Sequence, residues 1–290
     1  MDIIIKSKIL LKLKKDWMLY ILLLPMVLWY ITFAYKPMYG LLIAFKDFIN
    51  NKNIPYDDSG HGTHVSGIIA GSGKASNGRF KGIAPMSQII SVKVLDSYGN
   101  GKIGSVIDGA NWIINNKDIY NIKVANISFG TTPNSNVDIE NTIRLIKHIE
   151  NMWHNGIVVV AAAGNNGPCA KSITAPGTSH IIITVGSMDD KTFHSGRGPT
   201  TDGFPKPELV VAGSNITACS NRKNGYSTKS GTSMSAPIVS GAIARLLTSH
   251  DMTPEEVRCR LKKCCNKVNL PHNQQGWGHL DIIKFITMKT

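Results

Sequence analysis

A run of seven apolar residues, Ile157-Val158-Val159-Val160-Ala161-Ala162-Ala163, constrains the fold of this chain more than any other stretch. The run begins with β-branched residues and has no polar position, so a strand built from it must be buried on both faces. Similar strands are predicted at 88–95, 122–127 and 181–185, with helices between them. Strands that alternate with helices predict an α/β fold, in which helices cover both faces of a parallel sheet.

The composition fits a folded chain and limits its partners. Of the 290 residues, 42% are hydrophobic and 18% are charged, which excludes a disordered polar chain. The net charge is +13, and some of the positive excess lies in N-terminal lysines and some in a basic stretch at 258–267, so it is not one concentrated patch. Nucleic-acid binding needs a clustered basic stripe with a recognition motif, so we expect no nucleic-acid partner. The cysteines are odd in number, and Cys259, Cys264 and Cys265 are interpreted as thiols or one optional disulfide.

Residues 17–35 form an uncharged run, and crossing a bilayer core takes about 20 residues. Five lysines precede the run, so the positive-inside rule places the N-terminus in the cytoplasm and the following chain outside the cell. A cleaved signal peptide is one alternative, but no small-residue cleavage site follows. A buried core helix is another, but the run has no polar face. We therefore expect an uncleaved, single transmembrane helix.

The stretch Gly231-Thr232-Ser233-Met234-Ser235-Ala236-Pro237 is a turn of small residues that leads into an apolar helical run at 238–247. The positive end of the helix dipole and the free N–H groups of the first turn would lie beside Ser233, where a developing oxyanion is stabilised. An ordinary N-cap serine is the simpler interpretation. The α/β-hydrolase motif Gly-x-Ser-x-Gly fits poorly, because Ser235 stands at its second glycine.

Two further segments contain residue types that suit catalysis. His61 and His64 in Gly60-His61-Gly62-Thr63-His64 have a helical spacing that would suit a metal, but no third ligand of a zinc signature accompanies them, and we expect no metal site. Asn165 follows the central strand between glycines, in Gly164-Asn165-Asn166-Gly167. An amide at such a strand end can donate a hydrogen bond to an oxyanion, although the same residues also make a common turn.

The segments around His61, Asn165 and Ser233 resemble, in this order, the motifs of the subtilisin-like serine proteases (subtilases). The resemblance covers residues 54–290 and implies a peptidase domain with a subtilisin-like parallel sheet. It implies that Ser233 attacks a peptide carbonyl, that His61 is the general base, and that Asn165 binds the oxyanion. His64 would support His61 from the following helix. The resemblance also implies a peptide-binding surface and a mainly apolar specificity pocket, formed by Gly99, Asn100, Gly101, Ser128, Phe129, Gly130, Ala162 and Gly164.

The aspartate of the subtilase family has no counterpart in this sequence. Counting back from His61 to its usual position leads to Trp29, inside the apolar run. Asp58-Ser59-Gly60 imitates the motif but belongs to the histidine segment, so neither Asp57 nor Asp58 is expected to reach behind the His61 ring. The first strand of the sheet, which carries that aspartate in the family, is therefore expected to be missing. The family often binds calcium, but no acidic loop here can be assigned to it.

The N-terminal residues resemble a different kind of protein. Residues 17–25 and 36–48 look like the start of the membrane permease subunit of bacterial oligosaccharide-type ABC transporters. The chain is thus predicted to join a permease-like anchor, residues 1–50, to an incomplete peptidase domain, residues 54–290. The expected function is a serine endopeptidase weakened by the missing aspartate. The alternatives are a catalytically silent, membrane-tethered peptide-binding protein and a non-functional gene fusion.

Overall fold

The computed structural model of the protein describes residues 17–18, 24–25, 42–52, 54–131, 136–191, 194–222 and 225–288. The chain divides into two compact units, Met1–Ile43 and Ala44–Thr290. In the first unit, residues 17–18 and 24–25 are helical, and the rest of the predicted transmembrane run lies outside the described residues. The helices that are described include none with the length and apolar character needed to cross a membrane.

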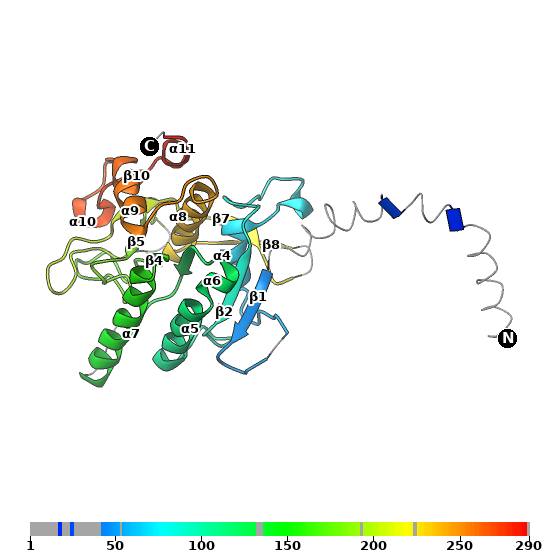
Figure 1. Ribbon diagram of the computed structural model, residues 1–290. Coiled ribbons are helices and arrows are strands. Elements are labelled where there is room, and N and C mark those ends of the chain that lie inside the picture. Colours follow the sequence, from blue (N-terminus) through cyan, green and yellow to red (C-terminus); the bar gives the residue numbers. More distant parts are fainter. Residues whose placement is uncertain are drawn as a thin grey trace. The chain divides into compact units, whose positions relative to one another are not determined.

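A six-stranded sheet forms the centre of the larger unit, with the order β3-β4-β5-β6-β10-β9 (Figure 1). The neighbouring pairs are parallel except for β10 and β9, which are antiparallel at one edge. All residues of β4, β5 and β6 are buried, and the parallel sheet predicted from the apolar run is confirmed. The strands are β3 (Val124–Ile127), β4 (Val158–Ala162), β5 (Ile183–Ser187), β6 (Leu209–Val211), β9 (Cys265–Asn266) and β10 (His279–Leu280).

Two pairs of long helices cover this sheet. On one side, α5 (Ile103–Asn115) packs on α7 (Asn136–His154), which contacts β4. On the other side, α8 (Thr232–Leu246) contacts β3, β4 and β5, and α4 (His61–Ala70) packs along α8 (Figure 1). The central helix α8 is buried over most of its length because its small residues allow close approach to its neighbours.

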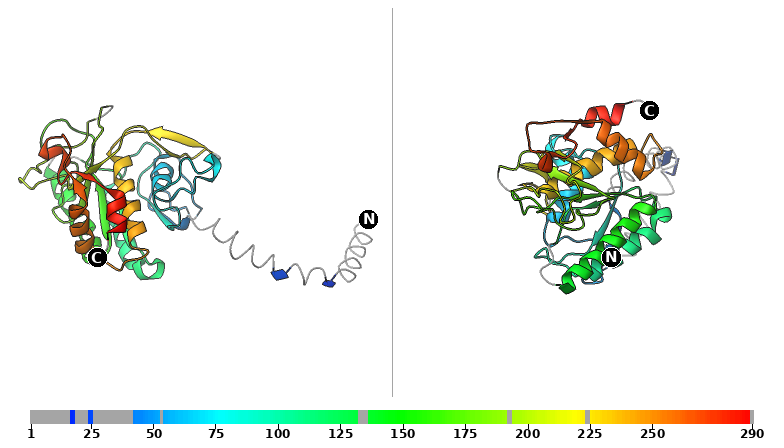
Figure 2. Two further views of the ribbon diagram at one scale, coloured as in Figure 1. Left: turned by 90° about the horizontal axis from the view of Figure 1, so that it is seen from above. Right: turned by 90° about the vertical axis from the view of Figure 1, so that its left-hand side faces the viewer.

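Two smaller sheets complete the unit. The first pairs β1 (Leu42–Asp47) with β2 (Ile89–Lys93), although the sequence pattern assigned residues 42–47 to the permease-like segment. The second is an antiparallel hairpin of β7 (Ile216–Cys219) and β8 (Tyr226–Lys229), which lies beside α4 (Figure 2). The sequence pattern predicted no hairpin there.

The C-terminal part of the chain supplies β10 and β9, which form one edge of the six-stranded sheet. The predicted cap of α9 is confirmed, because Thr253 Oγ1 accepts a hydrogen bond from Glu256 N while the Glu256 carboxylate accepts one from Thr253 N. All five cysteines are free, so the optional disulfide is not formed. The remaining helices are η2 (Lys74–Ser76), α6 (Lys117–Tyr120), α9 (Pro254–Lys263), α10 (His272–Gln275) and α11 (Ile282–Thr287).

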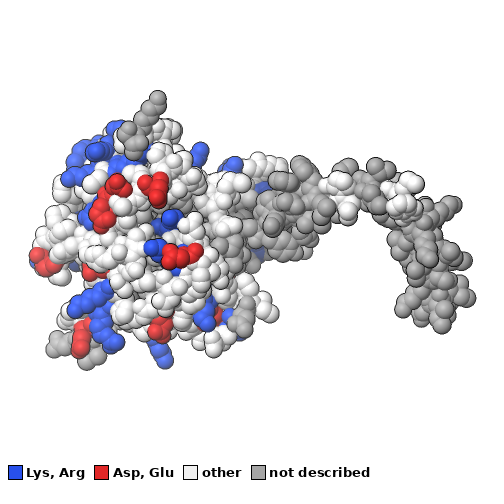
Figure 3. All heavy atoms as spheres, viewed as in Figure 1, with Lys and Arg blue, Asp and Glu red and all other residues white. Residues whose placement is uncertain are grey.

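The charged side chains of the described residues are mixed on the face that Figure 3 shows. Lysine and arginine side chains are spread over it, with acidic side chains between them. On this face the positive net charge is therefore not gathered into one patch.

Candidate active site

Ser233 is fixed to the end of strand β3. It is the second residue of α8, whose N-cap is Gly231, so the interpretation of Ser233 as the N-cap is wrong. Its Oγ donates a hydrogen bond to the carbonyl of Ser128 over 2.9 Å. In return, Ser128 Oγ donates to the carbonyl of Ser233 over 3.0 Å. This reciprocal pair joins the serine turn to the first residue after β3.

Asn165 is brought to the same turn from the end of β4. Its Oδ1 accepts hydrogen bonds from the N–H of Thr232 over 3.0 Å and from Thr232 Oγ1 over 3.1 Å. Thr232 Oγ1 itself accepts a hydrogen bond from Gly164 N. The Asn165 side chain is exposed, and with Oδ1 occupied its Nδ2 group is the one left to donate to a ligand. The position next to Ser233 N is suitable for an oxyanion.

His61 begins α4, a helix that packs along α8. Val65 of α4 and Met234 of α8 belong to one apolar cluster, so the helix ends that carry His61 and Ser233 lie at the same side of this pair. Among the described residues, the His61 ring has no hydrogen-bond partner, and Ser233 Oγ is bonded to Ser128 instead. Burial lowers the pKa of His61, and the positive charge of Lys229 lowers it further, while Asp57 opposes this shift.

The nearby aspartates are engaged elsewhere. Asp57 accepts hydrogen bonds from the N–H groups of Ser59, Gly60 and Thr63 and from Thr63 Oγ1, and so closes the start of α4. Burial alone would raise the pKa of Asp57, but these hydrogen bonds outweigh it and lower the pKa. Asp58 Oδ1 forms an ion pair with Lys93 Nζ over 2.7 Å.

Asp47, the third aspartate described before His61, is nearly fully buried. It accepts hydrogen bonds from the Tyr56 hydroxyl and from the backbone N–H groups of Ile49, Asn50 and Lys52. None of the three carboxylates is bonded to the His61 ring. Asp2 and Asp16 lie outside the described residues.

The segment Ser128–Gly130 and the end of β4 are joined through Thr174, which the sequence pattern did not single out. A side-chain carbon on either Gly130 or Gly164 would collide with Thr174 Oγ1. This hydroxyl is buried and has no hydrogen-bond partner among the described residues. The two segments predicted to form the specificity pocket therefore pack against a buried hydroxyl group that the sequence pattern did not indicate.

The third predicted segment, Gly99–Gly101, is an exposed turn after β2. Asp96 Oδ1 accepts hydrogen bonds from Tyr98 N and Asn100 N, and Asp96 N donates to Asn100 O. These bonds lie within the turn itself. They fix its conformation but do not tie it to the serine turn.

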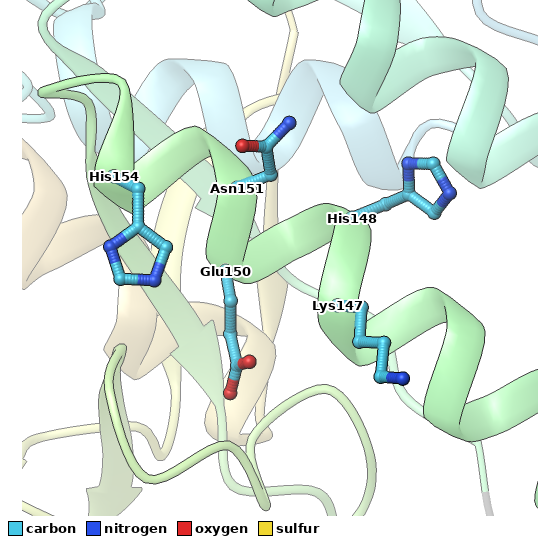
Figure 4. Close-up of a pocket in the computed structure, with 5 residues that line it drawn as sticks. All are labelled: Lys147, His148, Glu150, Asn151 and His154. Carbon is cyan, nitrogen blue, oxygen red and sulfur yellow. The ribbon is translucent and has the colours of Figure 1, made fainter.

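A hollow of about 360 Å³ lies elsewhere, on α7 (Figure 4). Its side chains all come from this one helix and point away from it in different directions. None of them belongs to the predicted site. Within the described ranges, no group of three or more histidines, cysteines or acidic residues could hold a metal ion. The residues that line the hollow are Lys147, His148, Glu150, Asn151 and His154.

A serine at the start of a buried helix, an asparagine amide beside it at a parallel strand end, and a histidine on the adjacent helix define the class of subtilisin-like serine peptidases. The profile of the subtilase family matches residues 43–278, and the chain belongs to this family. The match begins inside the segment 1–50 that the sequence pattern assigned to an anchor.

Curated relatives agree with this assignment. The chain is 37% identical to serine protease AprX of Bacillus subtilis (strain 168), over 81% of this chain and 59% of AprX. It is 30% identical to thermitase of Thermoactinomyces vulgaris, over 85% of this chain and 82% of thermitase. The chain spans 30% of the length of Epr, a minor extracellular protease of Bacillus subtilis (strain 168).

Solved structures show the same fold. A cold adapted subtilisin-like serine proteinase matches with a TM-score of 0.67 and 28% identity, over 84% of this chain and 81% of that one. Sphericase matches with a TM-score of 0.70 and 23% identity, over 81% of this chain and 83% of that one, which speaks for the fold alone.

Proposed function

We propose that the chain is a serine endopeptidase that hydrolyses peptide bonds slowly, because His61 lacks a carboxylate partner. The observation that supports this best is the network of Ser233, Ser128, Thr232 and Asn165. It holds the nucleophile and an oxyanion donor side by side before any substrate arrives. Preorganised donors of this kind usually supply the largest electrostatic contribution to catalysis.

In the proposed reaction, Ser233 Oγ leaves the Ser128 carbonyl, passes its proton to the neutral His61 ring and attacks the substrate carbonyl. Asn165 Nδ2 and Ser233 N donate to the oxyanion that forms. The tetrahedral intermediate then collapses, and the leaving amine takes the proton from His61. Water, deprotonated by the same ring, attacks the acyl-enzyme, and the departing Ser233 oxygen takes that proton back from His61 as the acid product is released.

The weak step is the formation of the His61 imidazolium. Burial and Lys229 lower the pKa of His61 and disfavour the charged ring, and no described carboxylate is hydrogen-bonded to it. In subtilisin, loss of the equivalent aspartate lowers turnover by about 3 × 10⁴. A similar or larger loss is expected here, because the strand that would carry the carboxylate is also proposed to be missing.

The proposed location follows from the N-terminal sequence. A transmembrane helix at 17–35 would tether the peptidase domain outside the cell, and its substrates would be peptides or proteins at that surface. The joining of a permease-like segment to this domain is proposed on the same basis.

A second candidate is a peptide-binding protein without turnover. It is favoured by one observation: Ser233 Oγ donates to the Ser128 carbonyl, while the His61 ring has no hydrogen bond to a described residue. A serine held in this way can line a groove without being activated. The substrate segments would then bind an extended peptide through their backbone groups.

Labelling of the full chain with a fluorophosphonate probe separates these functions. Ser233→Ala and His61→Ala should abolish the labelling of an active site. The matched control is Ser249→Ala, which removes an exposed serine at the other end of the α8 segment. No labelling of a chain shown to be folded by circular dichroism, together with binding of a peptide aldehyde, would establish the binding protein. An unfolded chain would point to a non-functional fusion.

A further inference from the structure

The two-stranded sheet β1–β2 and the six-stranded sheet are not joined by a hydrogen-bonded pair of β2 and β3. β3 pairs with β4 on one side, and β2 pairs with β1. Neither β2 nor β3 has a second paired strand among the described residues. Burial differs accordingly: every residue of β2 and every second residue of β3 is only partly buried, whereas β4 is buried throughout.

The helices pass from one sheet to the other without a break. On one side, α5 lies on β2, since Gly109 faces the Val92 and Val94 side chains, and α5 packs on α7 above β4. On the other side, α4 contacts β2 and packs on α8, which covers β3 and β4. The unpaired edges of β2 and β3 therefore lie between the same two helix layers, and the place between these edges is called the slot below.

The backbone of β3 offers hydrogen bonds to this slot. Val158 N donates to the carbonyl of Lys123, and β3 and β4 are parallel from Val124 onward. Because the bonding direction alternates along a strand, Ala125 and Ile127 face β4, whereas the N–H and C=O groups of Val124 and Asn126 face the slot. An unpaired edge of this kind is a template for an added strand.

The surroundings define the chemistry of that strand. A strand covered by helices on both sides is apolar on both faces. If the strand runs parallel to β3, its carboxyl end lies at the sheet edge where Ser128 follows β3 and Asn165 follows β4. The charged groups near His61 are Lys229, His64 when it is protonated, and the Asp57 carboxylate, whose oxygens are already engaged with the start of α4. An acidic residue complements this end of the slot.

We infer that the slot between β2 and β3 binds an extended segment of a second polypeptide, apolar along its length and with a carboxylate at its carboxyl end next to His61. Added strands in proteins are bound through main-chain hydrogen bonds, with side chains conferring selectivity. Binding in the slot does not depend on the proposed function. The effect on Ser233 does rest on it, because the carboxylate would stabilise the His61 imidazolium.

The test uses the full chain and a fluorescein-labelled peptide amide of five alternating valine and alanine residues followed by aspartate and glycine. A matched peptide has asparagine in place of aspartate, and a third carries N-methyl groups on alternate residues to block one hydrogen-bonding edge. Hydrogen exchange should slow at Val124 and Asn126 with the first two peptides, while Ala125 and Ile127 serve as internal controls. The N-methylated peptide should bind at least about tenfold more weakly, which corresponds to 1.4 kcal/mol.

Two further readouts separate binding from activity. In NMR spectra of [¹⁵N]histidine, the aspartate peptide should raise the pKa of His61 relative to the asparagine peptide. It should also raise the rate of fluorophosphonate labelling of Ser233, by up to about 10⁴-fold. If the His61 titration shifts but Ser233 stays unlabelled, the proposed peptidase function fails and the inferred slot is supported.

The inference is overturned if neither peptide protects Val124 and Asn126, or if the His61 titration is the same with both peptides. It is also overturned if these amides are already protected in the chain alone. Light scattering would then distinguish a dimer, with a second copy in the slot, from a monomer that fills the slot with its own N-terminal segment.

Discussion

The candidate active site has two parts, one with Ser233 and Asn165 and one with His61, and they differ in how they are attached to the central sheet. Ser233 and Asn165 are attached to strands β3 and β4 through hydrogen bonds of Ser128 and Thr232, and β4 is buried at every residue. His61 belongs to α4, which packs on α8 and also contacts the partly buried strand β2 and the hairpin β7–β8. The oxyanion side is therefore hydrogen-bonded to the ends of the larger sheet's strands, whereas α4 reaches that sheet chiefly through α8.

This difference shows that segments which match one family's motifs equally well in sequence can be attached to the rest of the fold to different degrees. The histidine segment is held locally: Asp57 closes the start of α4, and His64 Nε2 lies 3.1 Å from the Ile216 carbonyl and 2.9 Å from the Ser227 carbonyl. These contacts fix the helix and the hairpin. They do not orient the His61 ring, which needs a partner from another element.

The largest expected effect is a loss of stability when a buried ionic network in the six-stranded sheet is disrupted. Glu208 accepts hydrogen bonds from Lys206 Nζ over 2.8 Å, from Arg258 over 2.9 Å and from Thr184 N over 2.8 Å. Burial lowers the pKa of Lys206 to about 8 despite the attraction of Glu208. Glu208→Gln should leave the buried ammonium without its partner and lower the free energy of unfolding by about 3–5 kcal/mol, measured by urea denaturation.

The control for this prediction is the double variant Glu208→Gln with Lys206→Met, which removes both buried charges. It should recover a large part of the lost stability. A loss below about 1 kcal/mol in the single variant would mean that this network behaves like a surface pair. That result would contradict the view that the six-stranded sheet supports its part of the site more strongly than the contacts of α4 support the His61 part.

A slightly smaller effect is expected for the oxyanion donor. Asn165→Ala removes the Nδ2 donor, and the rate of Ser233 labelling or of peptide hydrolysis should fall by about 10²–10³. The kcat value should fall while KM changes little, because this contact forms in the transition state. Asn155→Ala is the matched control, since that side chain follows α7 and, among the described residues, donates to Asn151 in its last turns. Equal effects of the two variants would contradict the assigned role.

The third prediction concerns the pH dependence on the histidine side. Because burial and then Lys229 lower the pKa of His61, the neutral ring that accepts a proton persists to lower pH than in an ordinary histidine. The acidic limb of the Ser233 labelling rate should therefore lie below the ordinary pKa of about 6.5. Lys229→Met should move it upward, and Lys147→Met on α7 should not. A limb already above 6.5 would indicate a carboxylate paired with the ring.

The smallest effect is expected at the ion pair of Asp58 and Lys93. The Asp58 side chain is 33% exposed and solvent screens the pair, so Asp58→Asn should change the free energy of unfolding by about 0–1 kcal/mol. A double-mutant cycle with Lys93→Met measures the coupling. A coupling above 2 kcal/mol would show that the histidine side is as firmly built as the sheet side.

Much of the fold followed from local sequence patterns. The apolar run at 157–163 predicted β4, and the Thr253 cap predicted the start of α9. Boundaries shifted by a few residues: a strand expected at 181–185 is β5, Ile183–Ser187. The hairpin β7–β8 was missed, since its short strands carry a mixed pattern that no periodicity distinguishes from loop. Strand β1 was missed because residues 36–48 were assigned to the permease-like segment by their resemblance to it.

The sequence by itself determined the family and the order of the motifs, and it proposed the candidate catalytic residues, because these depend on residue type and spacing along the chain. Only the tertiary structure decided which of them meet. It joined Ser233 to Ser128 and Thr232 to Asn165, and it placed Thr174 between two predicted pocket walls. Within the part of the chain that the structure describes, it also left one edge each of β2 and β3 unpaired. Such contacts depend on which strands become neighbours, and strand neighbours are chosen by packing across the whole sheet, not by local pattern.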